Sequence, residues 1–212
     1  GIGRRLWQHA LKTLSGVQCI GLEAAVQMVG FYERAGFQKD CITTRRQMLF
    51  RSEASLDASP SQRSDVAVVP LHEVSLEAIQ RYDERHEISP RPHFLELWLR
   101  HRAGDVFVAR DAEGECHGYV RIRPCLLPIG EGWRVGPWLA EDPGMASLLL
   151  NNALDHHNGV VLIDTPGHNP SAKTILSARG FKPMTSTVRM YKGVIPRGHD
   201  RNVYGLACLE LG

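Results

Sequence analysis

The sequence predicts a mixed α/β protein with one central sheet flanked by helices, present as one partial and one complete copy. Residues 3–20 align without a gap with residues 146–163. After a one-residue insertion the match resumes, so that residues 34–37 (RAGF) align with residues 178–181 (ARGF). A repeat of this length indicates a duplicated domain and not a short-period solenoid. The order of predicted helices and strands, given below, supports the same fold class.

The first copy, residues 1–50, reads as helix, strand, helix and strand. Its opening segment has apolar residues near one face, which is typical of an amphipathic helix, and Gly16 is placed to end that helix. Gly36 follows the second helix as a left-handed cap. The last segment has the β-branched character of a strand. The predicted elements are a helix over 4–14, a strand over 17–22, a helix over 26–35 and a strand over 41–50.

Residues 51–65 change composition sharply, because they contain Ser, Asp, Ala and Pro and almost no large apolar residue. This composition predicts a linker. The alternative is a long surface loop inside one domain, but the repeat boundaries on either side favour the linker. The second copy then occupies residues 66–212.

The second copy opens with strand and helix signals, among them Ser75 as an N-cap and Pro92 in a first helical turn. A strand-rich meander is followed by alternating helices and strands, which is typical of one mixed sheet and not of a doubly wound fold. The predicted elements are a strand over 66–69, helices over 75–86 and from 92 to about 104, a hairpin over 105–123, a strand over 132–139, a helix over 144–156, a strand over 160–164, a helix over 169–179, and strands over 185–191 and 203–211.

The two copies differ in what precedes them. About 80 residues with strand and helix signals come before the matching part of the second copy, whereas the first copy starts at its helix. We therefore expect residues 1–50 to be the C-terminal half of a domain. A half sheet with an unpaired edge favours self-association with another copy of the chain.

Composition narrows the function classes. The net charge is +2, with 25 basic and 23 acidic residues interspersed, which argues against a nucleic-acid partner. No apolar run approaches the roughly 20 residues that span a bilayer. The five cysteines are widely spaced without a C-x-x-C pair, which fits free thiols in a reducing cytoplasm better than disulfides or a zinc site. We expect a cytoplasmic protein with no metal and no membrane partner.

The start of the first helix is a candidate anion site. A helix start offers unpaired N–H groups and a positive dipole end, and glycines let a phosphate approach them closely. The alternative is a simple turn. At the matching position the second copy has two carboxylates and Pro143, which repel phosphate and remove a donor. The residues of this site are Gly1, Ile2, Gly3, Arg4 and Arg5.

Tyr32 is a candidate proton donor. A tyrosine near the start of a short helix can present its hydroxyl to a leaving group, although the alternative is a tyrosine that packs the helix on the sheet. The second copy has Leu176 at the matching position, which packs but cannot donate a proton. Asp164, at the end of a predicted strand, is a weaker candidate: it either contacts an amine substrate or caps the following turn.

These motifs together resemble the GNAT superfamily of acyl-CoA-dependent N-acyltransferases. The G-x-G-x-x-L start, the strand after it and the FYERAGF segment look like the cofactor half of that fold, whose phosphate motif is Gln/Arg-x-x-Gly-x-Gly/Ala. The second copy resembles the C-terminal domain of tandem-GNAT proteins in a degenerate form, through residues 136–142, Asn169, 179–181, 189–191 and 209–212.

The resemblance implies transfer of an acetyl group from acetyl-CoA to the amine of a small molecule. It places the pyrophosphate on the N–H groups of Gly1, Gly3 and Arg4, and gives Tyr32 the role of protonating the CoA thiolate. In the family, the strand before the glycine loop polarises the thioester, so we expect this chain by itself to be weakly active or inactive. The alternative function is a non-catalytic ligand-binding or regulatory module.

Overall fold

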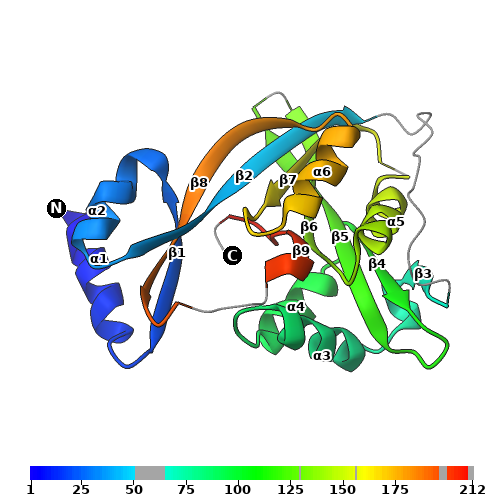
Figure 1. Ribbon diagram of the computed structural model, residues 1–212, viewed down its shortest axis with the longest axis horizontal. Helices are drawn as coiled ribbons and strands as arrows, with labels where there is room; N and C mark the ends of the chain where they lie inside the picture. Colours follow the sequence, from blue (N-terminus) through cyan, green and yellow to red (C-terminus); the bar gives the residue numbers. More distant parts are fainter. Residues whose placement is uncertain (51–64, 129, 156, 196–199, 210–212) are drawn as a thin grey trace.

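The computed structural model of the chain describes residues 1–50, 65–128, 130–155, 157–195 and 200–209. It contains a 9-stranded sheet in the order β1-β8-β2-β7-β6-β5-β4-β3, with β9 paired to β6 (Figure 1). The strands are β1 (Cys19–Ala25), β2 (Gln38–Phe50), β3 (Ala67–Pro70), β4 (Asp105–Arg110), β5 (Cys116–Leu127), β6 (Gly130–Ala140), β7 (Gly159–Thr165), β8 (Lys182–Gly193) and β9 (Val203–Gly205). The helices are α1 (Ile2–Thr13), α2 (Val29–Arg34), α3 (Leu76–His86), α4 (Pro92–Leu99), α5 (Pro143–Leu154) and α6 (Pro170–Ala178).

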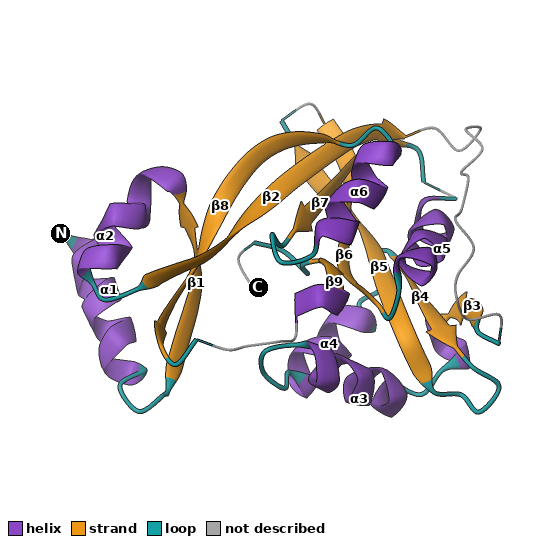
Figure 2. Cartoon of the chain, viewed as in Figure 1, coloured by secondary structure: helices purple, strands orange, loops and turns teal. Residues whose placement is uncertain are grey.

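Helices cover both faces of the sheet, which confirms the predicted fold class (Figure 2). On one face α5 and α6 bury a large apolar cluster that includes Trp138, whose indole N–H donates to the carbonyl of Ala146 at 3.1 Å. On the other face α3 and α4 enclose a second cluster that includes Tyr82 and Tyr119. A third, smaller cluster lies under α1 and α2 at the β1 end of the sheet. The core is therefore concentrated in the second copy.

β2 of the first copy and β8 of the second copy each cross into the sheet of the other copy. β2 lies between β7 and β8, and β8 lies between β1 and β2, all in antiparallel pairs. In Figure 1 these two strands form the long twisted band that joins the two ends of the molecule. Thr43 pairs directly with Thr187 across this band, and the two residues occupy matching positions after Gly36 and Gly180. The two copies are therefore related by a local two-fold axis that passes between these threonines.

The duplicated glycines have the same local structure. Gly36 has φ +89° and Gly180 has φ +84°, in the left-handed region that favours glycine. The N–H of Phe37 donates to the carbonyl of Tyr32 at 3.0 Å, and Phe181 donates to Leu176 in the same way at 3.0 Å. The predicted helix stop at Gly36 is confirmed.

Several boundaries differ from the prediction. The first helical segment after β1 begins with a 3-10 turn, Val26–Met28, so α2 itself is short. α4 ends at Leu99, not near Gly104, which instead precedes β4 with φ +102° and lies against the backbone of Ile122. β9 stops at Gly205 and does not continue through the tail. The other elements lie within a few residues of their predicted bounds.

Residues 51–64 of the predicted linker lie outside the described residues. The sheet is continuous across the described strands of both copies, and the division of the chain at the linker stays a prediction. In the part of the chain that the structure describes, no helix combines the length and apolar character needed to cross a membrane.

Candidate functional site

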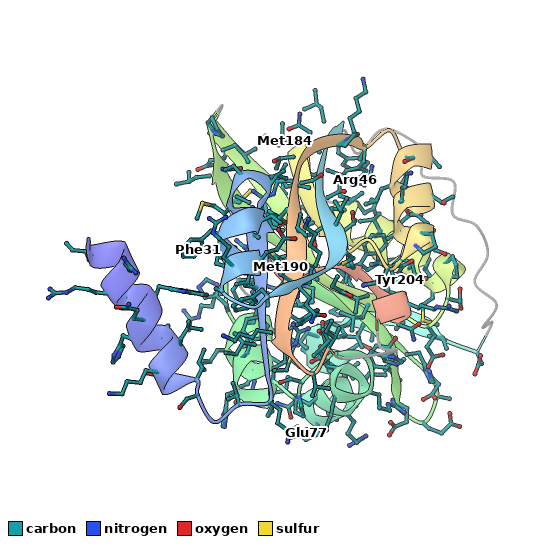
Figure 3. The ribbon with its side chains drawn as sticks, turned by 60° about the vertical axis from the view of Figure 1, so that its left-hand side comes forward. Phe31, Arg46, Glu77, Met184, Met190 and Tyr204 are labelled. Atoms are coloured by element: carbon teal, nitrogen blue, oxygen red, sulfur yellow. The ribbon has the colours of Figure 1, made fainter. Side chains whose placement is uncertain are left out.

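A wide groove of about 940 Å³ lies between α1 and α2, at the β1 end of the sheet. Trp7 is at its centre, with ring centroids 5.5 Å from Tyr32, 5.9 Å from Phe31 and 5.8 Å from Phe37. Gly3 and Arg4 line the same groove as Tyr32, so the structure brings two of the predicted cofactor residues together with the predicted acid. Figure 3 shows α1 projecting from the body of the molecule, and none of its residues is buried.

The N-terminus of α1 has no side-chain cap, like that of α4 and unlike those of α3, α5 and α6. In α3, α5 and α6 the side chains of Ser75, Asp142 and Asn169 accept hydrogen bonds from the first-turn N–H groups. α1 begins at Gly1 with no side-chain cap and no acidic residue in its first turn. A Cβ added at Gly3 would meet nothing within 4 Å. This helix start suits an anionic ligand, because its N–H groups are open, its first turn carries no negative charge, and Arg4 and Arg5 lie nearby.

The matching helix start in the second copy is already occupied by a negative side chain. Asp142 Oδ1 accepts from the N–H of Met145 at 2.9 Å, and Pro143 supplies no donor. The contrast between the copies that the sequence predicts is therefore present in the cap geometry.

Tyr32 is half-buried and packs on the face of β1 that carries Ile20 and Leu22. Its counterpart Leu176 is fully buried in the main core between α6 and the sheet. The aromatic contacts of Tyr32 are those of a packing residue, and its exposure on the groove is what a proton donor also requires. Both interpretations of Tyr32 fit one geometry.

Glu23 is a functional candidate that the sequence reasoning missed. Successive strand residues point to opposite faces, so Glu23 lies on the side of β1 opposite to Tyr32. Its side chain is 4% exposed and accepts from the hydroxyls of Thr43 at 2.8 Å and Thr187 at 2.7 Å, with Arg189 at 3.8 Å. Burial raises the pKa of Glu23 above its ordinary value, against the lowering effect of the two hydroxyls and Arg189.

A buried carboxylate with a raised pKa is a stronger proton acceptor than an exposed one, which is what a general base requires. The signal in the sequence was a single acidic residue within the otherwise uncharged β1 segment CIGLEAA. Nothing in the local pattern shows, however, that threonines from two distant strands would surround it.

Asp164 takes in the strand pairing of the second copy the place that Glu23 takes in the first, although the sequence alignment matches Asp164 with Gly21. Each acid is paired in register with an arginine from the exchanged strand, Glu23 with Arg189 and Asp164 with Arg45. Asp164 is 1% exposed, and Arg45 Nε and Nη2 donate to its two carboxylate oxygens at 2.7 and 2.9 Å. From the sequence, Asp164 was expected either to contact an amine substrate or to cap the following turn, and its ion pair with Arg45 is neither of these. An amine contact by Asp164 stays a prediction.

A small cavity of about 40 Å³ lies where the copies meet, beside Glu23, Arg189 and Tyr191. Glu87, at the end of α3, also lines it. Nearby, Asp40, Cys41 and His168 bring three potential ligand atoms within 4.8 Å of one another, with His168 Nε2 already 2.8 Å from an Asp40 carboxylate oxygen. Among the described residues this is the one group that could offer three metal ligands.

Comparison with known proteins agrees with this fold. A family described as "Acetyltransferase (GNAT) domain" matches residues 79–205, more than half of the chain. The holothin acyltransferase of Pseudoalteromonas sp. (strain SANK 73390) is 26% identical over 214 residues, which cover 100% of this chain and 68% of that protein.

Solved structures show the same arrangement. A proposed acetyltransferase from Pyrococcus horikoshii superimposes with a TM-score of 0.75 at 22% identity, covering 100% of this chain and 66% of that one. A tandem GNAT protein from the clavulanic acid biosynthesis pathway has a TM-score of 0.57 at 16% identity, covering 93% and 71%. The chain thus spans about two thirds of the length of these relatives.

Proposed function

This chain belongs to the acetyltransferase (GNAT) domain family, and we propose that it transfers an acetyl group from acetyl-CoA to the amine of a small molecule. Members of the family use an acyl-CoA co-substrate. The observation that carries the proposal is the groove between α1 and α2, which combines an uncapped helix start with Tyr32. Acetyl-CoA has phosphates, which an uncapped helix start can bind, and a thioester, whose departing thiolate Tyr32 can protonate.

In this proposal the diphosphate of acetyl-CoA binds at the first turn of α1. The N–H groups of Gly1, Ile2, Gly3 and Arg4 supply the donors, since the N–H of Arg5 already donates to the carbonyl of Gly1, and the side chains of Arg4 and Arg5 supply positive charge. Among the described residues β1 is an end strand of the sheet, and no described strand pairs with its outer edge. The pantetheine arm has two amides and is suited to lie along such an edge.

In this proposal the two proton transfers take place on opposite faces of β1. Glu23 accepts a proton from the ammonium form of the acceptor, and the free amine attacks the thioester carbonyl. The tetrahedral adduct collapses, the C–S bond breaks, and the departing thiolate takes the hydroxyl proton of Tyr32. The second proton of the amine nitrogen passes through solvent to the tyrosinate, which restores Tyr32, and Glu23 releases its proton to solvent. Glu23 and Tyr32 lie on opposite sides of β1, so both protons can move without the two groups meeting.

The carboxylates around the cavity between the copies support an amine as acceptor. Glu23 and Glu87 both line it, and a cationic amine is the partner that such side chains favour. The related Pseudoalteromonas protein is named a holothin acyltransferase, so holothin is a reasonable first acceptor to test.

We also propose that the open edge of β1 can pair with a second copy of the chain. Ile2 is 77% and Leu6 64% exposed on the adjoining helix, which leaves apolar surface beside that edge. Because acetyl-CoA and a second copy would use the same edge, acetyl-CoA should shift the chain towards the monomer in sedimentation experiments.

The proposed function is tested by mixing the chain with acetyl-CoA and candidate acceptors, including holothin, polyamines and amino acids. Free CoA thiol and acetylated amine are measured together. Equimolar formation of both, reduced in Tyr32→Phe, supports the transferase. Tight acetyl-CoA binding without acetylated product from any acceptor would support the alternative, a non-catalytic binding module.

A further inference from the structure

A second groove, separate from the α1–α2 groove, lies between α4 and β5. It has a volume of about 480 Å³. One side is a stripe of α4 residues at helical spacing, Phe94, Leu97 and Trp98, and the other side is Arg121 and Arg123 of β5. In Figure 1 α4 and β5 belong to the body formed by the second copy, whereas α1 and α2 lie at the opposite end.

Arg121 is a buried cation without a described counter-charge. It is 2% exposed, and its Nη2 donates to the carbonyl oxygens of Ala103 at 2.8 Å and His101 at 3.4 Å. Its Nε has no hydrogen-bond partner, and no carboxylate of the described residues forms an ion pair with it. Burial, with a smaller contribution from the charge of Arg123, lowers the pKa of Arg121 to about 10.

Both guanidinium groups lie over the same indole. The Cζ atoms of Arg121 and Arg123 are 5.2 and 4.9 Å from the centroid of Trp98, and Phe94 lies 5.2 Å from Trp98 on the helix. Stacking fixes the planes of the two groups, and no carboxylate of the described residues pairs with Arg121. A buried charge without a partner is costly, so an anion that enters this groove gains more than it would at an exposed arginine.

We propose that the α4–β5 groove binds a carboxylate that carries a flat, apolar body. The guanidinium of Arg121 meets the carboxylate through Nη1, because its Nε is buried and its Nη2 already donates to two carbonyl oxygens. The ring faces of Phe94 and Trp98 and the exposed side chain of Leu97 contact the apolar body. A bare phosphate fits less well, because most of the lining is apolar and offers few further donors. This inference is independent of the proposed transferase activity.

The test uses 2-naphthoate as probe and neutral 2-naphthamide as its matched control, both in the full chain. Binding is followed by tryptophan fluorescence and by thermal stabilisation. We expect 2-naphthoate to bind saturably and at least about tenfold more tightly than 2-naphthamide, because a hydrogen bond to a charged group favours the carboxylate by about that factor or more. Arg121→Met should lower 2-naphthoate affinity to that of the amide.

Controls separate a binding role from a structural one. Arg100→Gln removes an exposed charge of the same region, paired with Glu96, and should leave 2-naphthoate binding unchanged. Arg121→Met should keep or raise the melting temperature without probe, because an apolar side chain replaces an uncompensated buried charge. Arg121→Lys keeps the charge without the planar fork and should retain intermediate affinity.

Two results would overturn the proposal. One is equal affinity for 2-naphthoate and 2-naphthamide, which would leave only an apolar surface. The other is unchanged 2-naphthoate affinity in both Arg121 variants. If Arg121→Met unfolds, Arg121→Lys decides between the outcomes.

Discussion

Thr43 and Thr187 occupy matching positions in the two copies, face each other across β2 and β8, and both donate their hydroxyls to Glu23. The local two-fold relation of the sheet is therefore broken at its centre, because only one of the two related acids receives these hydrogen bonds. Asp164, one carbon shorter, is held by Arg45 instead. Asp164 therefore has a structural ion pair, whereas Glu23 is a buried carboxylate that accepts hydrogen bonds from two hydroxyl groups.

Glu23→Gln should change how stability depends on pH. The pKa of Glu23 in the folded chain is raised above its ordinary value of 4.5. Between these two values the folded chain holds a proton that the unfolded chain has lost, so the free energy of unfolding falls as the pH rises through that window. The amide cannot titrate, so the variant should gain stability relative to the parent chain as the pH increases. Urea unfolding at a series of pH values measures this, and parallel curves would contradict it.

Glu23→Gln should also lower kcat by about 10²-fold or more if Glu23 accepts the amine proton. The loss should be largest where the amine is protonated, so it should shrink as the pH approaches the pKa of the acceptor. A rate profile against pH, measured at saturating acetyl-CoA, checks this. A uniform loss at all pH values would show a positional role for Glu23.

Asp164→Asn should destabilise the fold by about 3 kcal/mol, because it leaves the partly buried Arg45 without its carboxylate. Lys39→Met is the matched control, since it removes the exposed pair between Lys39 and Glu33 and should cost less than about 1 kcal/mol. Denaturant unfolding of the two variants gives the comparison. Equal effects would mean that burial does not set the strength of the Asp164–Arg45 pair.

Tyr32→Phe should lower kcat by about 10²-fold and leave folding intact. Phenylalanine keeps the ring that packs against Trp7 and Phe37, so melting temperature and acetyl-CoA affinity should be those of the parent chain. Single-turnover release of CoA thiol isolates the chemical step. An unchanged rate would show that the thiolate leaves without an acid from this position.

Tyr82→Phe should stabilise the fold without affecting acyl transfer. Tyr82 is fully buried, and its hydroxyl has no hydrogen-bond partner among the described residues. Burial raises the pKa of Tyr82 well above its ordinary value. Removing an unsatisfied buried hydroxyl should raise the free energy of unfolding by about 1 kcal/mol. Denaturant unfolding tests the gain, and a loss of stability would indicate a water or other partner at that hydroxyl.

The elements that were predictable from the sequence are those that depend on local chemistry. The Ser75 cap and the left-handed Gly36 follow from single residues and their neighbours, and the structure confirms both. The exchange of β2 and β8 could not be predicted, because two copies with the same pattern offer the same pairing surfaces. Which strand pairs with which is decided by the folded chain and not by periodicity.

In the candidate site, too, local features could be predicted from the sequence and long-range contacts could not. The difference between the starts of α1 and α5 could be predicted from the sequence, because α1 starts with glycines and α5 with Asp142 and Pro143. Glu23 was missed and the partner of Asp164 was unforeseen, because their contacts come from residues more than a hundred positions away in the chain, Thr187 and Arg45. Long-range contacts of single charges leave no local pattern.

Acetyl-CoA binding at the start of α1 is the central claim, and the stability of Gly3→Glu and Gly3→Gln tests it most directly. Both side chains have room, because nothing lies within 4 Å of a Cβ at Gly3, and they differ only in charge. At 100 times its Kd, acetyl-CoA should stabilise the parent chain by about 2.7 kcal/mol. We predict that Gly3→Gln keeps most of this stabilisation and Gly3→Glu loses it. Equal stabilisation of both variants, or none in the parent chain, would contradict the account.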